Sequence, residues 1–197
     1  MTTTKILIED RNYTSWKIVD NPDNLEVEPL KYKLFHDDTI YISDNKIEVV
    51  HSPVKTSNDH PGILVLDIMK TYGKKKDKFM YKCIPDDRHL PIFLVPYKIR
   101  ENNYENKYIT FKYDRWRYKH PEGIITNNLG DVSKLTSFYE YQLYCKSLNA
   151  SIQKFTQDTT RVLKKYTEDE VVNKILNTYP QIKDRTKMAN VFTIDPV

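Results

Sequence analysis

The chain has 197 residues, 29% of them charged and 39% hydrophobic, which is enough apolar material for one large domain or two to three small ones. No apolar run approaches the ~20 residues of a membrane span, and the first residues lack the apolar core of a signal peptide. We therefore expect no membrane partner and an intracellular location, cytoplasmic or nuclear. The formal net charge of +4 alone predicts no partner, and with only four glycines the chain has no Gly-rich phosphate loop.

The cysteines and histidines do not indicate a metal site. Cys83 and Cys145 lie far apart, fit no metal-ligand spacing and do not resemble a disulfide framework, so both are interpreted as reduced core residues. The five histidines also lack ligand spacing and fall in expected loops, so none is assigned a ligand role.

The N-terminal part of the chain contains short apolar segments separated by turn residues. Residues 1–30 are interpreted as an N-terminal extension or as first strands, because Ile6–Ile8 and Trp16–Val19 are both short and apolar. Thr39–Ser43 alternates apolar and polar residues, and Lys46–Val50 does so again after a tight Asp-Asn turn. This pattern predicts a β-hairpin.

Two further strands are expected before residue 90. Gly62–Asp67 is a compact apolar run, and Phe79–Ile84 follows a basic loop at residues 70–78. Four or five short strands joined by loops are typical of a small barrel of the OB or cold-shock type. We therefore assign residues 31–90 to a first barrel.

A charged segment, Asp-Asp-Arg-His, stands between Pro85 and Pro91. The two prolines forbid a helix and hold the chain extended, so we interpret the segment as the joint between two β-units. The second unit, residues 91–135, is expected to form another OB-like barrel, five-stranded and closed or nearly closed. Its expected strands are Ile92–Ile99, Tyr108–Tyr113 and Gly123–Asn127.

Alternation along the middle strand of this unit assigns its side chains to two faces. The core-facing set is predicted to be Ile109, Phe111 and Tyr113. The surface set is predicted to be Tyr108, Thr110 and Lys112. Trp116 follows the core-facing set and is interpreted as a packing residue.

Beyond residue 135 the apolar period becomes helical, and we expect a helical connector over residues 136–190. One stripe consists of Phe138, Tyr141, Cys145 and Leu148. A second helix is predicted to begin with a capping box between Thr167 and Glu170 and to end at Pro180. The predicted fold is thus mainly β, with two tandem OB-like barrels followed by α-helices.

The segment from Lys70 to Arg117 has more basic than acidic residues, with aromatic residues interleaved. This composition is typical of a surface that holds phosphates and stacks bases, although solvated lysines and core tyrosines give the same pattern. The candidate RNA-binding residues are Tyr72, Lys74, Lys75, Lys76, Tyr81, Lys82, Tyr108, Lys112, Arg115 and Arg117.

Several of these segments resemble the second cold-shock domain of the RNB family of exoribonucleases, the RNase II, RNase R and eukaryotic exosome catalytic subunit type. At the joint the matching residues are Ile84, Pro85, Asp87, Pro91 and Phe93. Further along they are Asp114, Trp116, Pro121, Gly123, Leu129, Gly130 and Asp131. The chain departs from the family pattern at His89, Arg115 and Ser133. Its low Gly and high Lys, Asn and Tyr content is similar to versions encoded by large DNA viruses, which would act in the host cytoplasm.

The last residues resemble the strand that opens the catalytic domain of this family. Residues 191–197 are interpreted as that first strand, and Asp195 aligns with the first of four aspartates that hold Mg²⁺ for hydrolysis of RNA from its 3′ end. The other three would lie past Val197. Because one aspartate cannot assemble such a site, the chain alone is predicted to be inactive. Without the resemblance, Asp195 would be read as capping a turn before Pro196.

Two functional hypotheses follow. In the first, the chain is the single-stranded-RNA-guiding portion of a hydrolytic 3′→5′ exoribonuclease and associates with a catalytic domain beyond Val197. In the second, it is a stand-alone, non-catalytic RNA-binding or interaction module of the cold-shock type. An Asp-x-Asp-Asp cluster encoded soon after Val197 would favour the first hypothesis, and a stop codon there would favour the second.

Overall fold

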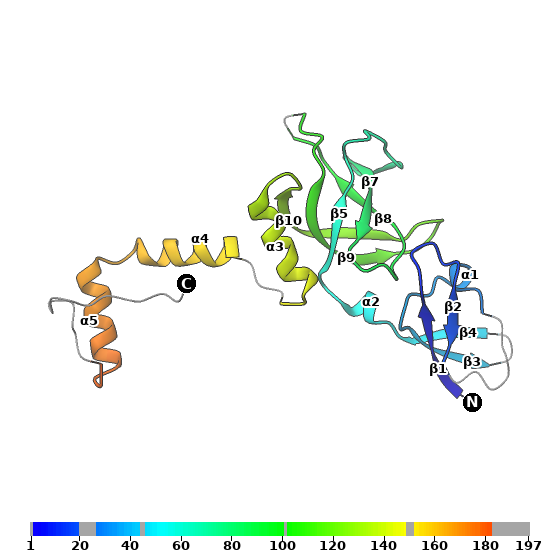
Figure 1. The fold of residues 1–197 in the computed structure, drawn as a ribbon, viewed down its shortest axis with the longest axis horizontal. Coiled ribbons are helices and arrows are strands. Elements are labelled where there is room, and N and C mark those ends of the chain that lie inside the picture. The colour runs from blue at the N-terminus through cyan, green and yellow to red at the C-terminus, as the bar shows by residue number, and fades with distance from the viewer. Residues whose placement is uncertain (1, 20–26, 44–45, 101, 149–151, 183–197) are drawn as a thin grey trace, which may run out of the picture. The chain divides into compact units, whose positions relative to one another are not determined.

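The computed structural model describes residues 2–19, 27–43, 46–100, 102–148 and 152–182. The chain divides into two compact units, residues 1–150 and residues 151–197. The prediction of a mainly β chain with helices toward its C-terminus is confirmed (Figure 1). None of the described helices has the length and apolarity needed to cross a lipid bilayer.

The N-terminal strands of the first unit form an antiparallel sheet with the order β2-β1-β3-β4. The predicted hairpin is confirmed, since Ser43 at the end of β3 pairs with Lys46 at the start of β4. Ile6, Leu34 and Ile40 are fully buried in the core of this sheet. The elements are β1 (Thr2–Ile8), β2 (Trp16–Ile18), α1 (Pro29–Tyr32), β3 (Thr39–Ser43), β4 (Lys46–His51) and α2 (Pro53–Thr56).

Five of the following strands close into one barrel. The order is β5-β9-β10-β8-β7, and a further pairing of β7 with β5 completes the ring. Only β8 and β10 run parallel, and the other pairs are antiparallel. In chain order the pairing is first–second–third–fifth–fourth–first, an OB-like topology. The strands are β5 (His60–Leu64), β6 (Lys74–Lys75), β7 (Lys78–Pro85), β8 (Phe93–Tyr97), β9 (Lys107–Arg115) and β10 (Glu122–Asp131).

The two tandem barrels predicted over residues 31–90 and 91–135 are not confirmed. β5 and β7 precede residue 90, yet they close the same barrel as β8, β9 and β10. Residues 92–127 therefore supply only part of a barrel, instead of the complete one that we expected. The physical reason is that alternation fixes the two faces of a strand but not its neighbours. The proline-bracketed joint is a turn within the barrel, between β7 and β8.

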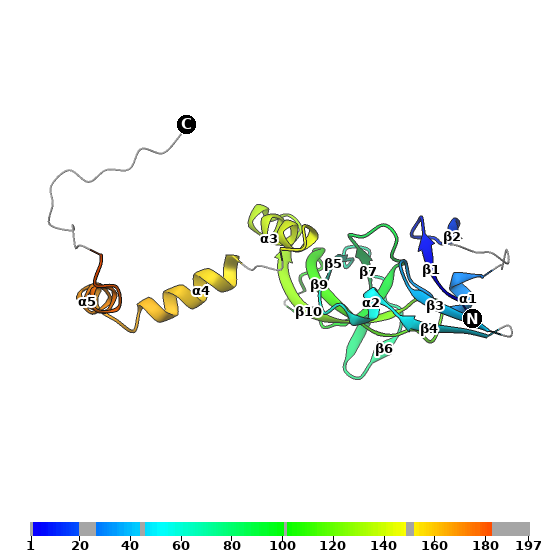
Figure 2. The same cartoon turned by 90° about the horizontal axis from the view of Figure 1, so that it is seen from below.

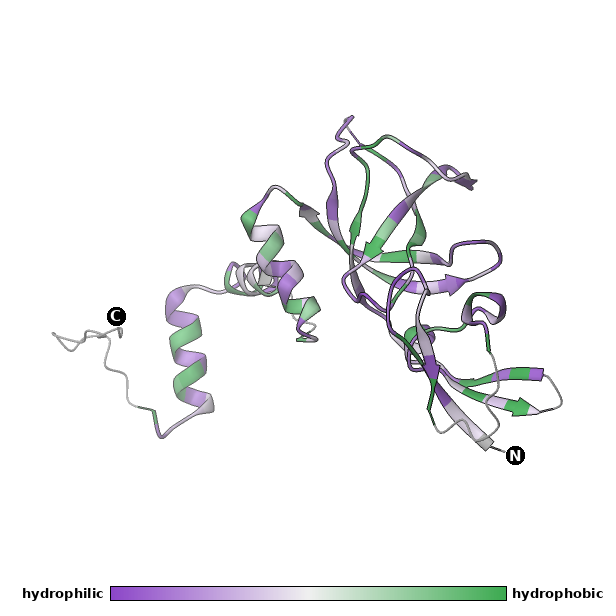
Figure 3. Cartoon of the chain, turned by 45° about the vertical axis from the view of Figure 1, so that its right-hand side comes forward, coloured by the Kyte–Doolittle hydropathy of each residue, from purple (hydrophilic) through white to green (hydrophobic). Residues whose placement is uncertain are grey.

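The core of the barrel is continuous with the N-terminal segment. Phe35 is fully buried there, with its ring centroid 5.9 Å from that of Phe93 and 5.0 Å from that of Trp116. This confirms the packing role predicted for Trp116. Gly123 leaves room for Phe111, since a Cβ at that position would lie 2.9 Å from the ring. Figure 3 shows hydrophobic and hydrophilic residues alternating along several of these strands.

Helix α3 (Leu135–Cys145) packs on the outside of the barrel, beside β9 and β10 (Figure 2). Its Tyr141 stacks on Tyr108 with a centroid distance of 4.3 Å. The predicted apolar stripe is only partly correct, because Phe138 and Leu148 are exposed. The buried face of α3 consists instead of Ser137, Glu140, Tyr141 and Tyr144. Gly130, with a φ of +117°, lies against Ser137, so a Cβ at position 130 would clash with the Ser137 side chain and β10 can approach the helix closely only with glycine there.

The second unit contains α4 (Ile152–Leu163) and α5 (Glu168–Thr178). The predicted capping box is confirmed: Thr167 N–H donates to Glu170, and Glu170 N–H donates to the Thr167 hydroxyl. No residue from 155 to 182 is buried, and Phe155 and Tyr179 are among its exposed apolar side chains. The strand predicted at residues 191–197 lies outside the described residues.

Candidate nucleic-acid interface

The barrel topology identifies the face where a ligand is expected. OB barrels bind oligonucleotides on their second and third strands, together with the loops that join strands one to two and four to five. Here these are β7 and β8, the loop of residues 65–77 and the loop of residues 116–121. We call this surface the β7–β8 face.

A pocket of about 230 Å³ lies on the β7–β8 face. The first loop contributes Tyr72, Gly73, Lys74 and Lys75 to its lining, and the strands contribute Met80 and Leu94. The remaining lining residues are Arg115, Tyr118, His120 and Glu122. The pocket thus joins candidates that were predicted on two separate barrels, namely Tyr72, Lys74, Lys75 and Arg115.

Two cations and two carboxylates form an ion network at this pocket. Lys75 Nζ lies 2.6 Å from Asp114 Oδ2 and 3.1 Å from Glu122 Oε2. Arg115 Nε donates to the same Glu122 oxygen at 3.0 Å, and Arg115 Nη2 lies 2.9 Å from it. Burial would raise the pKa of Glu122, but hydrogen bonds from Arg115 and Lys75 lower it. Lys75 and Arg115 are therefore engaged by carboxylates and are weaker candidates for phosphate contacts than we expected.

The other lysines of the face lie against aromatic rings instead of carboxylates. The ammonium groups of Lys70 and Lys82 lie 5.5 Å and 5.1 Å from the centroid of Tyr72. Lys74 lies 5.8 Å from the centroid of Phe79, its partner across the β6–β7 hairpin. In the described part of the chain, none of these lysines forms an ion pair. Their charges are available for a phosphate backbone.

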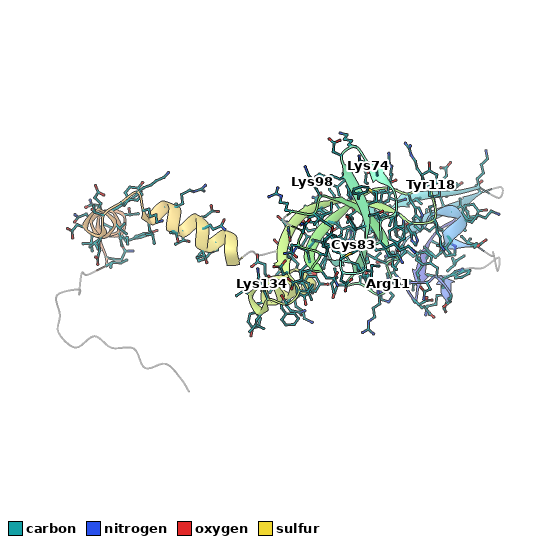
Figure 4. The ribbon with its side chains drawn as sticks, turned by 90° about the horizontal axis from the view of Figure 1, so that it is seen from above. Arg11, Lys74, Cys83, Lys98, Tyr118 and Lys134 are labelled. Carbon is teal, nitrogen blue, oxygen red and sulfur yellow. The ribbon has the colours of Figure 1, made fainter. Side chains whose placement is uncertain are left out.

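Tyr118 projects from the second loop with 80% of its surface exposed. In Figure 4 it lies toward the same edge of the first unit as Lys74 and Lys98, with Cys83 in the middle of the barrel. The sequence analysis missed Tyr118 and Phe79. The available signal for Tyr118 was its position between Arg117 and Lys119, in the segment that separates the expected strands Tyr108–Tyr113 and Gly123–Asn127.

Two predicted stacking residues, Tyr81 and Tyr108, are buried, so the prediction is wrong for both. Tyr81 faces the barrel core and is 5% exposed. Tyr108 faces outward as predicted, but α3 covers it and leaves it 8% exposed. Thr110 also belongs to that outward set and is fully buried. A buried ring cannot stack on a base, so Tyr81 and Tyr108 serve as packing residues.

The remaining candidates lie outside the pocket lining. Lys76 is exposed in the turn between β6 and β7, where it has a φ of +55°. Arg117 is exposed in the second loop, and its carbonyl accepts a hydrogen bond from Lys33 at 3.0 Å. Lys112 is exposed on β9. Lys76 and Arg117 remain on the β7–β8 face through their loops, whereas Lys112 does not.

His120 adds an uncharged ring to the pocket. Burial lowers the pKa of its imidazole, and the nearby charges of Lys119 and Lys82 lower it further. Its neutral form is therefore favoured at neutral pH, where it contributes aromatic surface without adding positive charge.

The described residues do not test the predicted metal site. No group of three or more His, Cys, Asp or Glu side chains within them is placed to hold a metal ion. Asp195, the residue expected to contribute to Mg²⁺ binding, lies outside the described residues.

Comparison with known families agrees with the barrel topology. Residues 80–140 match the family model for the Dis3-like cold-shock domain 2. The matched segment runs from within β7 to α3; it includes most of β7, all of β8 and the loop of residues 116–121, but not the loop of residues 65–77. This similarity supports the expected likeness to the N-terminal cold-shock region of an RNB-family exoribonuclease, without specifying a member. A search of curated proteins found no significant match.

Proposed function

We propose that this chain binds single-stranded RNA on the β7–β8 face and guides it as the N-terminal portion of a hydrolytic 3′→5′ exoribonuclease of the RNB family. The observation that carries the proposal is the OB-like arrangement of exposed aromatic rings and unpaired lysines on that face. The match to a Dis3-like cold-shock domain supports it independently.

Different side chains of the β7–β8 face would contact the phosphates and the bases of the RNA. Lys70, Lys74 and Lys82 would follow the phosphates, while Tyr118 and Phe79 would stack on bases. Stacking on a side chain requires a base that is free from its neighbours, and bases inside a duplex are not. The face therefore favours single strands over duplexes.

The catalytic part of the proposal depends on the family resemblance alone. Asp195 would be one of four aspartates that hold Mg²⁺, and that ion supplies water activation and charge stabilisation when it is bound. A single carboxylate cannot perform this chemistry, so the 197-residue chain is proposed to bind RNA without cleaving it.

Fluorescence anisotropy with labelled single-stranded and duplex RNA of equal length tests the binding proposal. We expect single strands to bind more tightly, and we expect Lys82→Ala to weaken their binding. Lys17→Ala is the matched control, because Lys17 pairs with Glu9 on the N-terminal sheet. Equal affinity for single strands and duplexes would contradict the proposal. Release of mononucleotides by the pure chain in Mg²⁺ would contradict the proposed lack of activity.

A further inference from the structure

The pocket on the β7–β8 face is small for a ligand site. Its volume of about 230 Å³ is below the roughly 300–1,000 Å³ typical of pockets for drug-sized ligands. It has room for one heterocyclic ring system but not for a whole nucleotide. Tyr118 and His120 supply ring surfaces along its lining.

The charges at the pocket favour a base over a phosphate. Lys75 and Arg115 are balanced there by Glu122 and Asp114, so the network has no net charge. A phosphate entering it would meet the Glu122 carboxylate. The lysines without a carboxylate partner lie over aromatic rings: Lys74, which also lines the pocket, lies over Phe79, and Lys70 and Lys82 lie over Tyr72.

Glu122 has an unused hydrogen-bond acceptor. Its Oε2 atom accepts all the hydrogen bonds from Lys75 and Arg115. Its Oε1 atom has no donor among the described residues. An ionised carboxylate that is 11% exposed gains most from a ligand that brings its own N–H donors.

Guanine fits this set of groups best. It carries two neighbouring donors, N1–H and the N2 amino group, which suit a carboxylate. It also carries the acceptors O6 and N7, which suit Lys or Arg. Uracil offers a single donor between two acceptors, and adenine and cytosine offer only an amino group.

Building on the proposed RNA binding, we infer that this pocket takes one unstacked guanine base of the bound strand. Glu122 accepts hydrogen bonds from the base edge, Lys75 or Arg115 donates to O6, and Tyr118 stacks on the ring. The face then prefers strands with a guanosine at one position, in addition to its general affinity for phosphates.

The test uses the full chain and four ten-nucleotide RNAs: oligouridine and its variants with one central guanosine, adenosine or cytidine. We expect the guanosine strand to bind about 10-fold more tightly than oligouridine, and the other two less than 3-fold. Equal binding of all four, or a preference for another base, would overturn the guanine pocket and leave the proposed RNA binding intact. Absence of any RNA binding would overturn both.

Inosine provides a second test that requires no protein variant. It keeps N1–H and O6 but lacks the N2 amino group, so we expect it to lose most of the guanosine preference. Glu122→Gln is expected to abolish the preference, with Glu48→Gln, an exposed carboxylate of β4, as the control that retains it. Undiminished binding of the inosine strand, together with an unaffected preference in a folded Glu122→Gln variant, would overturn the role of Glu122.

Discussion

Tyr118 is the most exposed aromatic residue of the β7–β8 face, at 80%. Stacking of a base on such a ring contributes about 1–3 kcal/mol. We therefore expect Tyr118→Ala to weaken binding of single-stranded RNA about 10-fold, with no change in the urea midpoint. Tyr139→Ala is the matched control, because Tyr139 is a 54% exposed tyrosine on α3. Wild-type affinity in the Tyr118→Ala variant would remove the stacking role.

Asp131 is the counter-ion of a buried lysine at the end of the barrel strand β10. It accepts hydrogen bonds from the buried Lys107 and, at 2.8 Å, from Lys134. These two partners lower its pKa below the ordinary value for a carboxyl group. Its stabilising contribution is therefore complete above about pH 4, where the unfolded carboxyl ionises, and is lost as the pH falls through the lowered folded-state pKa.

Replacing this carboxylate tests that contribution. Asp131→Asn would leave the Lys107 ammonium buried without a counter-ion, at an expected cost of about 3 kcal/mol in the free energy of unfolding at pH 7. The variant should also lose less stability than the wild type between pH 5 and pH 2. Urea unfolding across this pH range measures both effects. Asp37→Asn, which breaks an exposed pair with Lys5, should change stability by less than about 1 kcal/mol.

At the scale of elements, Arg11 connects the turn after β1 to the turn between β7 and β8. Its guanidinium donates to the carbonyls of Pro85 at 2.5 Å, Leu90 at 3.2 Å and Asp87 at 3.3 Å. His36, in the connection between α1 and β3, stacks on His89 at 4.2 Å between centroids and joins a second N-terminal segment to the same β7–β8 turn. The proline-bracketed turn is thus held by contacts from the N-terminal segment.

This connection predicts that Arg11→Lys is not a conservative change. A lysine keeps the charge but lacks the planar guanidinium group whose N–H donors reach the three carbonyls. We therefore expect a loss of about 1–2 kcal/mol in the free energy of unfolding. Urea unfolding measures it, with Lys17→Ala as a control on the same sheet. Equal stability of Arg11→Lys and wild type would mean that charge alone serves at this position.

Individual elements were predicted from the sequence far better than their assembly. The β3–β4 hairpin, the Trp116 packing role and the Thr167 capping box depend on neighbouring residues, and all three are confirmed. Barrel closure depends on the pairing of β5 with β9, more than 40 residues away, which no local pattern encodes. The prediction of the site residues was limited in the same way, because the burial of Tyr108 depends on α3, a helix that follows it in the chain.

For the molecule as a whole, the net charge of +4 says little about RNA affinity, because 31 basic residues are offset by 27 acidic ones. What matters is which cations lack a carboxylate partner. In the described part of the β7–β8 face, Lys75 and Arg115 are paired, whereas Lys74 and Lys82 are not. Phosphate binding should therefore depend on Lys74 and Lys82.

The salt dependence of binding tests this distinction. Each phosphate contact on a single strand contributes about 0.7 to the slope of log affinity against log salt. The double variant Lys74→Ala/Lys82→Ala should lower that slope by about 1.4. Lys5→Ala/Lys17→Ala makes the same change in net charge, from +4 to +2, at two lysines of β1 and β2 and should leave the slope unchanged. An equal reduction in both variants would show that RNA responds to the total charge of the molecule, and the β7–β8 face would then have no special role in phosphate binding.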